Sequence, residues 1–82
     1  DPLTSLGLTS GDYADLMTRL VALVPAYRSL IFLEGGYDLA ALTESTAATV
    51  SALLGGSYQP EKATSAGPGL AVVQQVAERF KP

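Results

Sequence analysis

The sequence predicts an α/β fold in which helices cover a parallel sheet. An uninterrupted apolar run, residues 30–33, lies between two helix-like segments, and Gly35 and Gly36 follow it directly. A strand buried on both faces has such a continuous apolar run, because helices cover both faces of a parallel sheet. The chain offers one such strand. A lone buried strand leaves its backbone polar groups unpaired, so we expect its neighbours to come from further polypeptide.

The first helix is predicted to begin after Thr9 and to end near Val24. Asp12 stands three residues after Thr9, which is a variant of the capping box. Apolar side chains then recur at helical spacing, at Tyr13, Leu16, Met17, Leu20 and Val24. Pro25 lacks the N–H group that a helix interior needs, so the helix is expected to stop before it.

The second helix is predicted over residues 39–54, with Asp38 as its N-cap and Gly55-Gly56 closing it, one of the two glycines being left-handed. Its middle is rich in small residues, which let a helix lie close to a sheet. Residues 57–68 contain two prolines and read as an exposed linker. Apolar residues between Leu70 and Phe80 predict a short C-terminal helix.

Composition excludes several classes of function. The net charge is −3 and the five basic residues are scattered, so no patch for direct nucleic-acid binding is expected. The chain has no cysteine and no histidine, which excludes thiolate metal sites and a histidine base within it. No segment is long and apolar enough to span a membrane, and the start lacks signal-peptide features. A cytoplasmic protein is therefore expected, and the oligomeric state stays open.

Three short motifs occur in a characteristic order: Asp1-Pro2-Leu3, Leu6-Gly7-Leu8-Thr9 and, after the apolar run, Glu34-Gly35-Gly36-Tyr37-Asp38-Leu39. This order resembles the zinc-dependent histone deacetylase superfamily, which includes bacterial acetylpolyamine amidohydrolases and acetoin-utilisation proteins, and is closest to its bacterial, class II-like branch. The resemblance extends to about Leu54. It implies that residues 1–56 are the C-terminal part of an arginase/deacetylase-like three-layer α/β/α catalytic domain, with 57–68 as a linker and 69–82 as a C-terminal helix.

The resemblance also implies roles for single residues. Tyr37 would be catalytic, donating a hydrogen bond to the oxyanion formed from an acetyl carbonyl. Asp1 would be one carboxylate ligand of a zinc ion. Gly35 and Gly36 would shape the substrate-binding loop, and Leu8 would form a wall of the acyl tunnel. Each residue also has a purely structural interpretation, such as a tyrosine covering the end of the sheet or an ordinary Asp-Pro turn.

The implied activity is zinc-dependent hydrolysis of acetyl-amide bonds in acetylated lysine or polyamine. The histidine pair and the Asp-x-His metal pair of the family are absent from these 82 residues, so the chain alone is expected to be inactive. One alternative is a non-catalytic, small α-rich interaction or remnant module. Another is a strand–Gly-Gly–helix element that binds phosphate, which is disfavoured because Asp38 places negative charge at the anion position.

Overall fold

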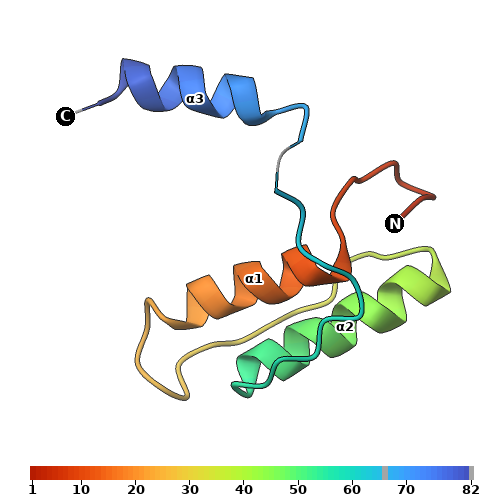
Figure 1. The fold of residues 1–82 in the computed structure, drawn as a ribbon. Helices are drawn as coiled ribbons and strands as arrows, with labels where there is room; N and C mark the ends of the chain where they lie inside the picture. The colour runs from red at the N-terminus through yellow and green to blue at the C-terminus, as the bar shows by residue number, and fades with distance from the viewer. Residues whose placement is uncertain (66, 82) are drawn as a thin grey trace.

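The computed structural model describes residues 1–65 and 67–81, and its described part contains three helices and no strand (Figure 1). The helices are α1 (Ser10–Val21), α2 (Leu39–Leu53) and α3 (Leu70–Arg79). All three were predicted from the sequence. The predicted linker and C-terminal segment, 57–68 and 69–82, each include one residue, 66 and 82, that lies outside the described part.

The start of α1 confirms the predicted capping box. The Thr9 hydroxyl accepts a hydrogen bond from the Asp12 N–H (3.2 Å), and the Asp12 carboxylate accepts one from the Thr9 N–H (2.8 Å). Two N–H groups that the helix itself cannot pair are thereby satisfied. The helix ends at Val21, three residues before the predicted end, and turn-type hydrogen bonds from the N–H groups of Leu23 and Val24 continue the chain toward Pro25.

The two ends of α2 also follow the sequence. The Asp38 carboxylate accepts a hydrogen bond from the Ala41 N–H (2.9 Å). At the other end Gly55 has φ +82°, its N–H donates to the Ala52 carbonyl, and the Gly56 N–H donates to the Ser51 carbonyl. This pair of bonds is a Schellman motif, which glycine favours because it adopts positive φ without strain.

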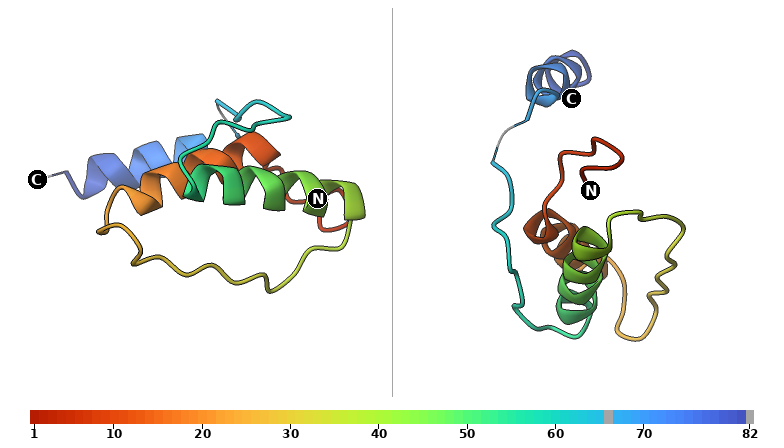
Figure 2. Two further views of the ribbon diagram at one scale, coloured as in Figure 1. Left: turned by 90° about the horizontal axis from the view of Figure 1, so that it is seen from below. Right: turned by 90° about the vertical axis from the view of Figure 1, so that its right-hand side faces the viewer.

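The core lies between α1 and α2, which run side by side (Figure 2). Its buried apolar side chains are Ala14 and Met17 of α1 and Ala48 and Ala52 of α2, with Val21 and Leu53 packed at the edge. Alanines at the contact let the two backbones approach closely. The predicted apolar stripe of α1 is only partly buried, since Met17 is covered whereas Leu16 and Leu20 remain exposed.

The predicted α/β fold is wrong for this chain. Residues 30–33 run as an extended segment beside the helices and form no strand, and no sheet exists within residues 1–65 and 67–81. The arginase/deacetylase-like three-layer α/β/α arrangement with a parallel sheet is therefore not present. A strand exists only through hydrogen bonds to a neighbouring strand, and the described residues supply none. Leu30 and Phe32 consequently stay 85% and 79% exposed.

Residues 61–64, here called the strap, cross the N-terminal end of α1. The Thr9 hydroxyl donates to the Lys62 carbonyl (2.6 Å), the Glu61 carboxylate accepts from the Ser10 N–H (3.1 Å), and Glu61 N–H donates to the Ser10 hydroxyl (3.1 Å). The strap comes so close that a Cβ at Gly11 would overlap its backbone. A segment expected as a linker thus makes specific contacts with a helix.

Helix α3 lies away from the α1–α2 pair (Figures 1 and 2). It buries no residue and packs against neither of the other two helices. Among the described residues, no helix is both long and apolar enough to cross a membrane.

Candidate functional site

Asp1 connects the N-terminal turn to the beginning of α2. One carboxylate oxygen accepts hydrogen bonds from the N–H groups of Tyr37 (2.8 Å) and Asp38 (3.1 Å), and the other accepts one from Leu3 (2.9 Å). A carboxylate is favourable at this place, because the N-terminal end of a helix carries partial positive charge. Two residues far apart in the sequence, Asp1 and Tyr37, are therefore brought together.

The two glycines shape the loop that carries Tyr37. Gly36 has φ +135°, a conformation that side-chain-bearing residues rarely adopt, and a Cβ there would lie 2.6 Å from Leu42 Cδ1. A Cβ at Gly35 would lie 3.6 Å from the Tyr37 hydroxyl, so the phenol folds back over this glycine. The ring remains 66% exposed.

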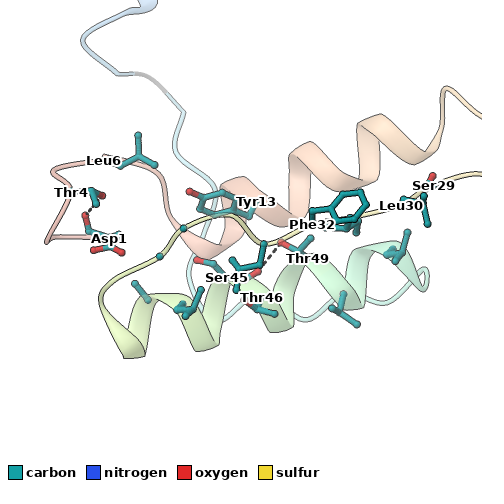
Figure 3. Close-up of a pocket in the computed structure, with 18 residues that line it drawn as sticks. Asp1, Thr4, Leu6, Tyr13, Ser29, Leu30, Phe32, Ser45, Thr46 and Thr49 are labelled. Carbon is teal, nitrogen blue, oxygen red and sulfur yellow. Dashed lines mark hydrogen bonds between the residues drawn. The ribbon is translucent and has the colours of Figure 1, made fainter.

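A cavity of about 840 Å³ lies between the extended segment 29–36 and α2. We call it the apolar groove. In Figure 3, Asp1, Thr4 and Leu6 lie at one end, Ser29 and Leu30 lie toward the other, and small side chains of α2 lie between them. Its α2 side is formed by Ala41, Leu42, Ser45, Thr46, Thr49, Val50 and Leu53, and its other side by Leu30, Ile31, Phe32, Leu33, Gly35 and Gly36.

The groove contains few charges. Its lining is aliphatic, aromatic, hydroxyl-bearing or glycine, apart from the Asp1 carboxylate at one end. Chemically, such a surface suits uncharged apolar side chains and offers hydroxyl groups for an occasional hydrogen bond. The small residues in the middle of α2, noted in the sequence, form this face. These small residues indicated that another element packs closely against this face of α2, but they did not identify that element.

The sequence-predicted site residues are only partly assembled. Asp1, Gly35 and Gly36 line one end of the groove, and Tyr37 lies next to them in the chain, with its N–H bonded to Asp1, but does not line the groove. Leu8 is not brought to the groove. It precedes the Thr9 cap of α1 and is partly exposed.

A zinc ion would find one candidate ligand here. Residues 1–65 and 67–81 contain no group of three or more metal-binding side chains. The Asp1 carboxylate, moreover, already accepts hydrogen bonds from three N–H groups. Zinc sites use three or four protein ligands, so the described residues do not fit a zinc ion on their own.

A second group of hydrogen bonds, apart from those around Asp1, joins the strap to the start of α1. Asp12 accepts hydrogen bonds from the N–H (2.6 Å) and hydroxyl (3.0 Å) of Thr64, besides the bond from the Thr9 N–H. The Thr9 backbone hydrogen bond, with those from Thr64, lowers the pKa of the Asp12 carboxyl below its ordinary value, against an opposing effect of burial. Sequence reasoning identified Asp12 as a capping residue and missed its contact with Thr64.

Comparisons with protein-family models, with curated proteins and with solved structures found no match to the chain.

Proposed function

We propose that the chain is a small α-helical interaction module, not catalytic by itself, that binds another polypeptide through the apolar groove. The observation that carries this proposal is the large surface that the chain exposes, 6711 Å². A compact monomer of 8.5 kDa exposes about 4,700 Å², so about 2,000 Å² more is open than such a fold requires. The radius of gyration, 14.4 Å, also exceeds the value of about 12 Å for a compact domain of this length.

The excess is more than the area that one protein partner usually covers. Stable complexes bury about 800 Å² on each partner. The exposed surface includes the whole apolar run of the extended segment, with Leu30, Phe32 and Leu33 all at least two-thirds exposed. Burying apolar surface contributes about 25 cal/mol per Å². Covering the exposed apolar side chains of the groove would therefore stabilise the chain.

The chemistry of the groove selects the class of partner. Nucleic acid is disfavoured because the groove has no basic side chain and carries a carboxylate at one end. Phosphate at the start of α2 is disfavoured because the carboxylates of Asp1 and Asp38 already accept its N–H groups. An apolar polypeptide segment suits the groove best.

Site-specific photo-cross-linking tests this proposal. A photoreactive benzoylphenylalanine replaces Leu30 in the groove or, as a matched control, Leu23, which lies after α1 outside the groove and is 79% exposed. The expected result is a discrete cross-linked polypeptide from position 30 and none from position 23.

The cross-link must also depend on the groove. Thr46→Arg places a charge in the groove and should abolish the cross-link, whereas Thr43→Arg, on the same helix but outside the lining, should retain it. Equal yields from the two positions, or a cross-link indifferent to Thr46→Arg, would overturn the proposal.

A second candidate function rests on one contact. The resemblance gives Asp1 and Tyr37 roles as metal ligand and oxyanion donor, and the Tyr37 backbone N–H donates a hydrogen bond of 2.8 Å to the Asp1 carboxylate. We propose that, with ligands and a base from further polypeptide, this end of the groove contributes to a zinc-dependent deacetylase acting on acetylated lysine or polyamine. Tyr37 would stabilise negative charge through its hydroxyl. A cytoplasmic location belongs to this proposal, and cell fractionation tests it.

The test uses the complete product of the coding sequence. Hydrolysis of an acetyl-lysine peptide and of an acetylated polyamine is measured with and without zinc, in Tyr37→Phe and in Tyr58→Phe, a second exposed tyrosine outside the groove. The expected result is a sharp loss of turnover in the first variant at unchanged zinc content. Unchanged turnover in Tyr37→Phe would remove the tyrosine from the mechanism.

A further inference from the structure

Helix α3 is amphipathic, and its apolar face packs against neither of the other two helices. Most of its apolar residues gather on one face, with Val72 at the edge of that face, and its polar residues and Ala71 occupy the opposite face. The apolar set, completed by the C-cap Phe80, is Leu70, Val73, Val76, Ala77 and Phe80. All of these side chains are exposed, and the helix packs against neither α1 nor α2. An isolated helix of 10 residues is marginal in water, so its stability depends on covering this face.

The apolar groove fits α3 in length. A helix of 10 residues is about 15 Å long, and the stretch of α2 that lines the groove, residues 41–53, is about 18 Å long. Both surfaces are apolar and nearly free of charge. The apolar face of α3 and the apolar groove are therefore complementary in length and in chemistry.

Charge gives the orientation. Asp1 lies at the end of the groove near the start of α2. Arg79 and Lys81 lie at the C-terminal end of α3, where they outnumber Glu78, the partner of Lys81. Opposite charges meet when α3 runs antiparallel to α2. The same orientation places the negative C-terminal end of α3 beside the positive N-terminal end of α2, which is favourable for the helix dipoles.

We propose that the partner is a second copy of this chain, and that each copy inserts its α3, antiparallel to α2, into the apolar groove of the other. This inference rests on the proposed docking function and names its occupant. The strap favours exchange between copies, because its bonds to α1 fix the chain shortly before α3 begins, and α3 leaves from there away from its own α1–α2 pair (Figure 2). A symmetric exchange covers both faces in both copies.

Complementation in solution tests the exchange. Sedimentation equilibrium should give the wild type twice the 8.5 kDa of one chain. Val76→Glu, on the apolar face of α3, and Thr46→Arg, in the groove, should each weaken the dimer at least about tenfold, because each buries a charge. Gln75→Glu, on the polar face, should not. Mixing the two defective variants should restore a dimer, since one copy keeps an intact groove and the other an intact α3.

Disulfide trapping tests the orientation and the exchange together. The chain contains no cysteine, so only the introduced residues can form disulfides, and peptide mapping shows which two are joined. Leu42→Cys with Phe80→Cys should form an intermolecular disulfide, whereas Leu53→Cys with Phe80→Cys should not. A disulfide within one chain, or trapping only of the second pair, would overturn the inference.

The two levels of proposal fail separately. A wild-type chain that stays monomeric while position 30 cross-links to a different polypeptide overturns the second-copy inference and leaves the docking function standing. A monomer that also gives no groove-dependent cross-link overturns both.

Discussion

Gly11→Ala gives a direct test of the strap, because two effects of opposite sign compete. Gly11 lies in the first turn of α1, where alanine is intrinsically the better helix former. If the strap did not lie on α1, the substitution would therefore stabilise the chain by up to about 1 kcal/mol. In the structure, however, the added Cβ would overlap the backbone of Glu61, Lys62 and Ala63, so the strap must move away.

The size of the loss follows from the contacts that the strap makes with Thr9, Ser10 and Asp12. Five hydrogen bonds are lost when the strap moves away, each worth about 1 kcal/mol net. Releasing about three residues returns about 1 kcal/mol of backbone entropy for each. The balance, after the gain in helix propensity, is a destabilisation of about 1 kcal/mol, or a fall in Tm of about 4–8 °C.

Urea unfolding followed by circular dichroism measures this change. Gly7→Ala is the matched control, since a Cβ at Gly7 meets nothing within 4 Å, and it should leave the midpoint unchanged or slightly higher. A Gly11→Ala chain that is more stable than the wild type would refute the docked strap, because helix propensity alone would then determine the outcome.

Acidification is expected to destabilise the chain, because the pKa of Asp12 in the folded chain lies below its ordinary value of 3.8. The ionised carboxylate therefore contributes fully to the free energy of unfolding above pH 3.8. This contribution is lost as the pH falls through the lower pKa of the folded chain. The urea midpoint, followed from about pH 7 to about pH 2, should fall less in Asp12→Asn than in the wild type. Ala48→Leu should cost about 1–3 kcal/mol by overfilling the α1–α2 contact, whereas Ala47→Leu, on the exposed face of α2, should change the free energy of unfolding little. Gly36→Ala should cost about 1 kcal/mol or more, because its φ of +135° disfavours a side chain and Leu42 blocks the space; thermal unfolding measures this change too.

The local signals in the sequence were sufficient to predict the helices. The capping residues Thr9 and Asp38 and the terminal Gly55 act within a few residues of their own helix, so the pattern of residues determines the ends. The strap could not be predicted in this way. Its contacts join residues about fifty positions apart, and the one local sign was a glycine, Gly11, in the first turn of a helix, where close backbone approach needs the missing side chain.

The apolar run 30–33 shows the limit of the same reasoning. A continuous apolar run indicates that a segment is buried in the functional state, but it does not indicate which element packs against that segment. The strand prediction added a sheet that the described part of the chain does not contain. In its place, the extended segment stands off from α2 and leaves the groove between them. The exposed run and the small-residue face of α2 are thus two sides of one uncovered surface.

Asp1 separates the two proposed functions, because each assigns it a different task. For docking, its carboxylate positions the loop by accepting N–H groups from Tyr37 and Asp38, and its attraction for the basic end of a docked α3 is an exposed charge pair worth at most about 1 kcal/mol. The side-chain carbonyl of asparagine can accept these N–H groups too. For zinc chemistry the negative carboxylate itself is needed as a ligand. Asp1→Asn should therefore leave the position-30 cross-link intact but abolish zinc-dependent hydrolysis by the complete product. If cross-linking and hydrolysis were lost together, with zinc content unchanged, Asp1 would be a positioning residue in both.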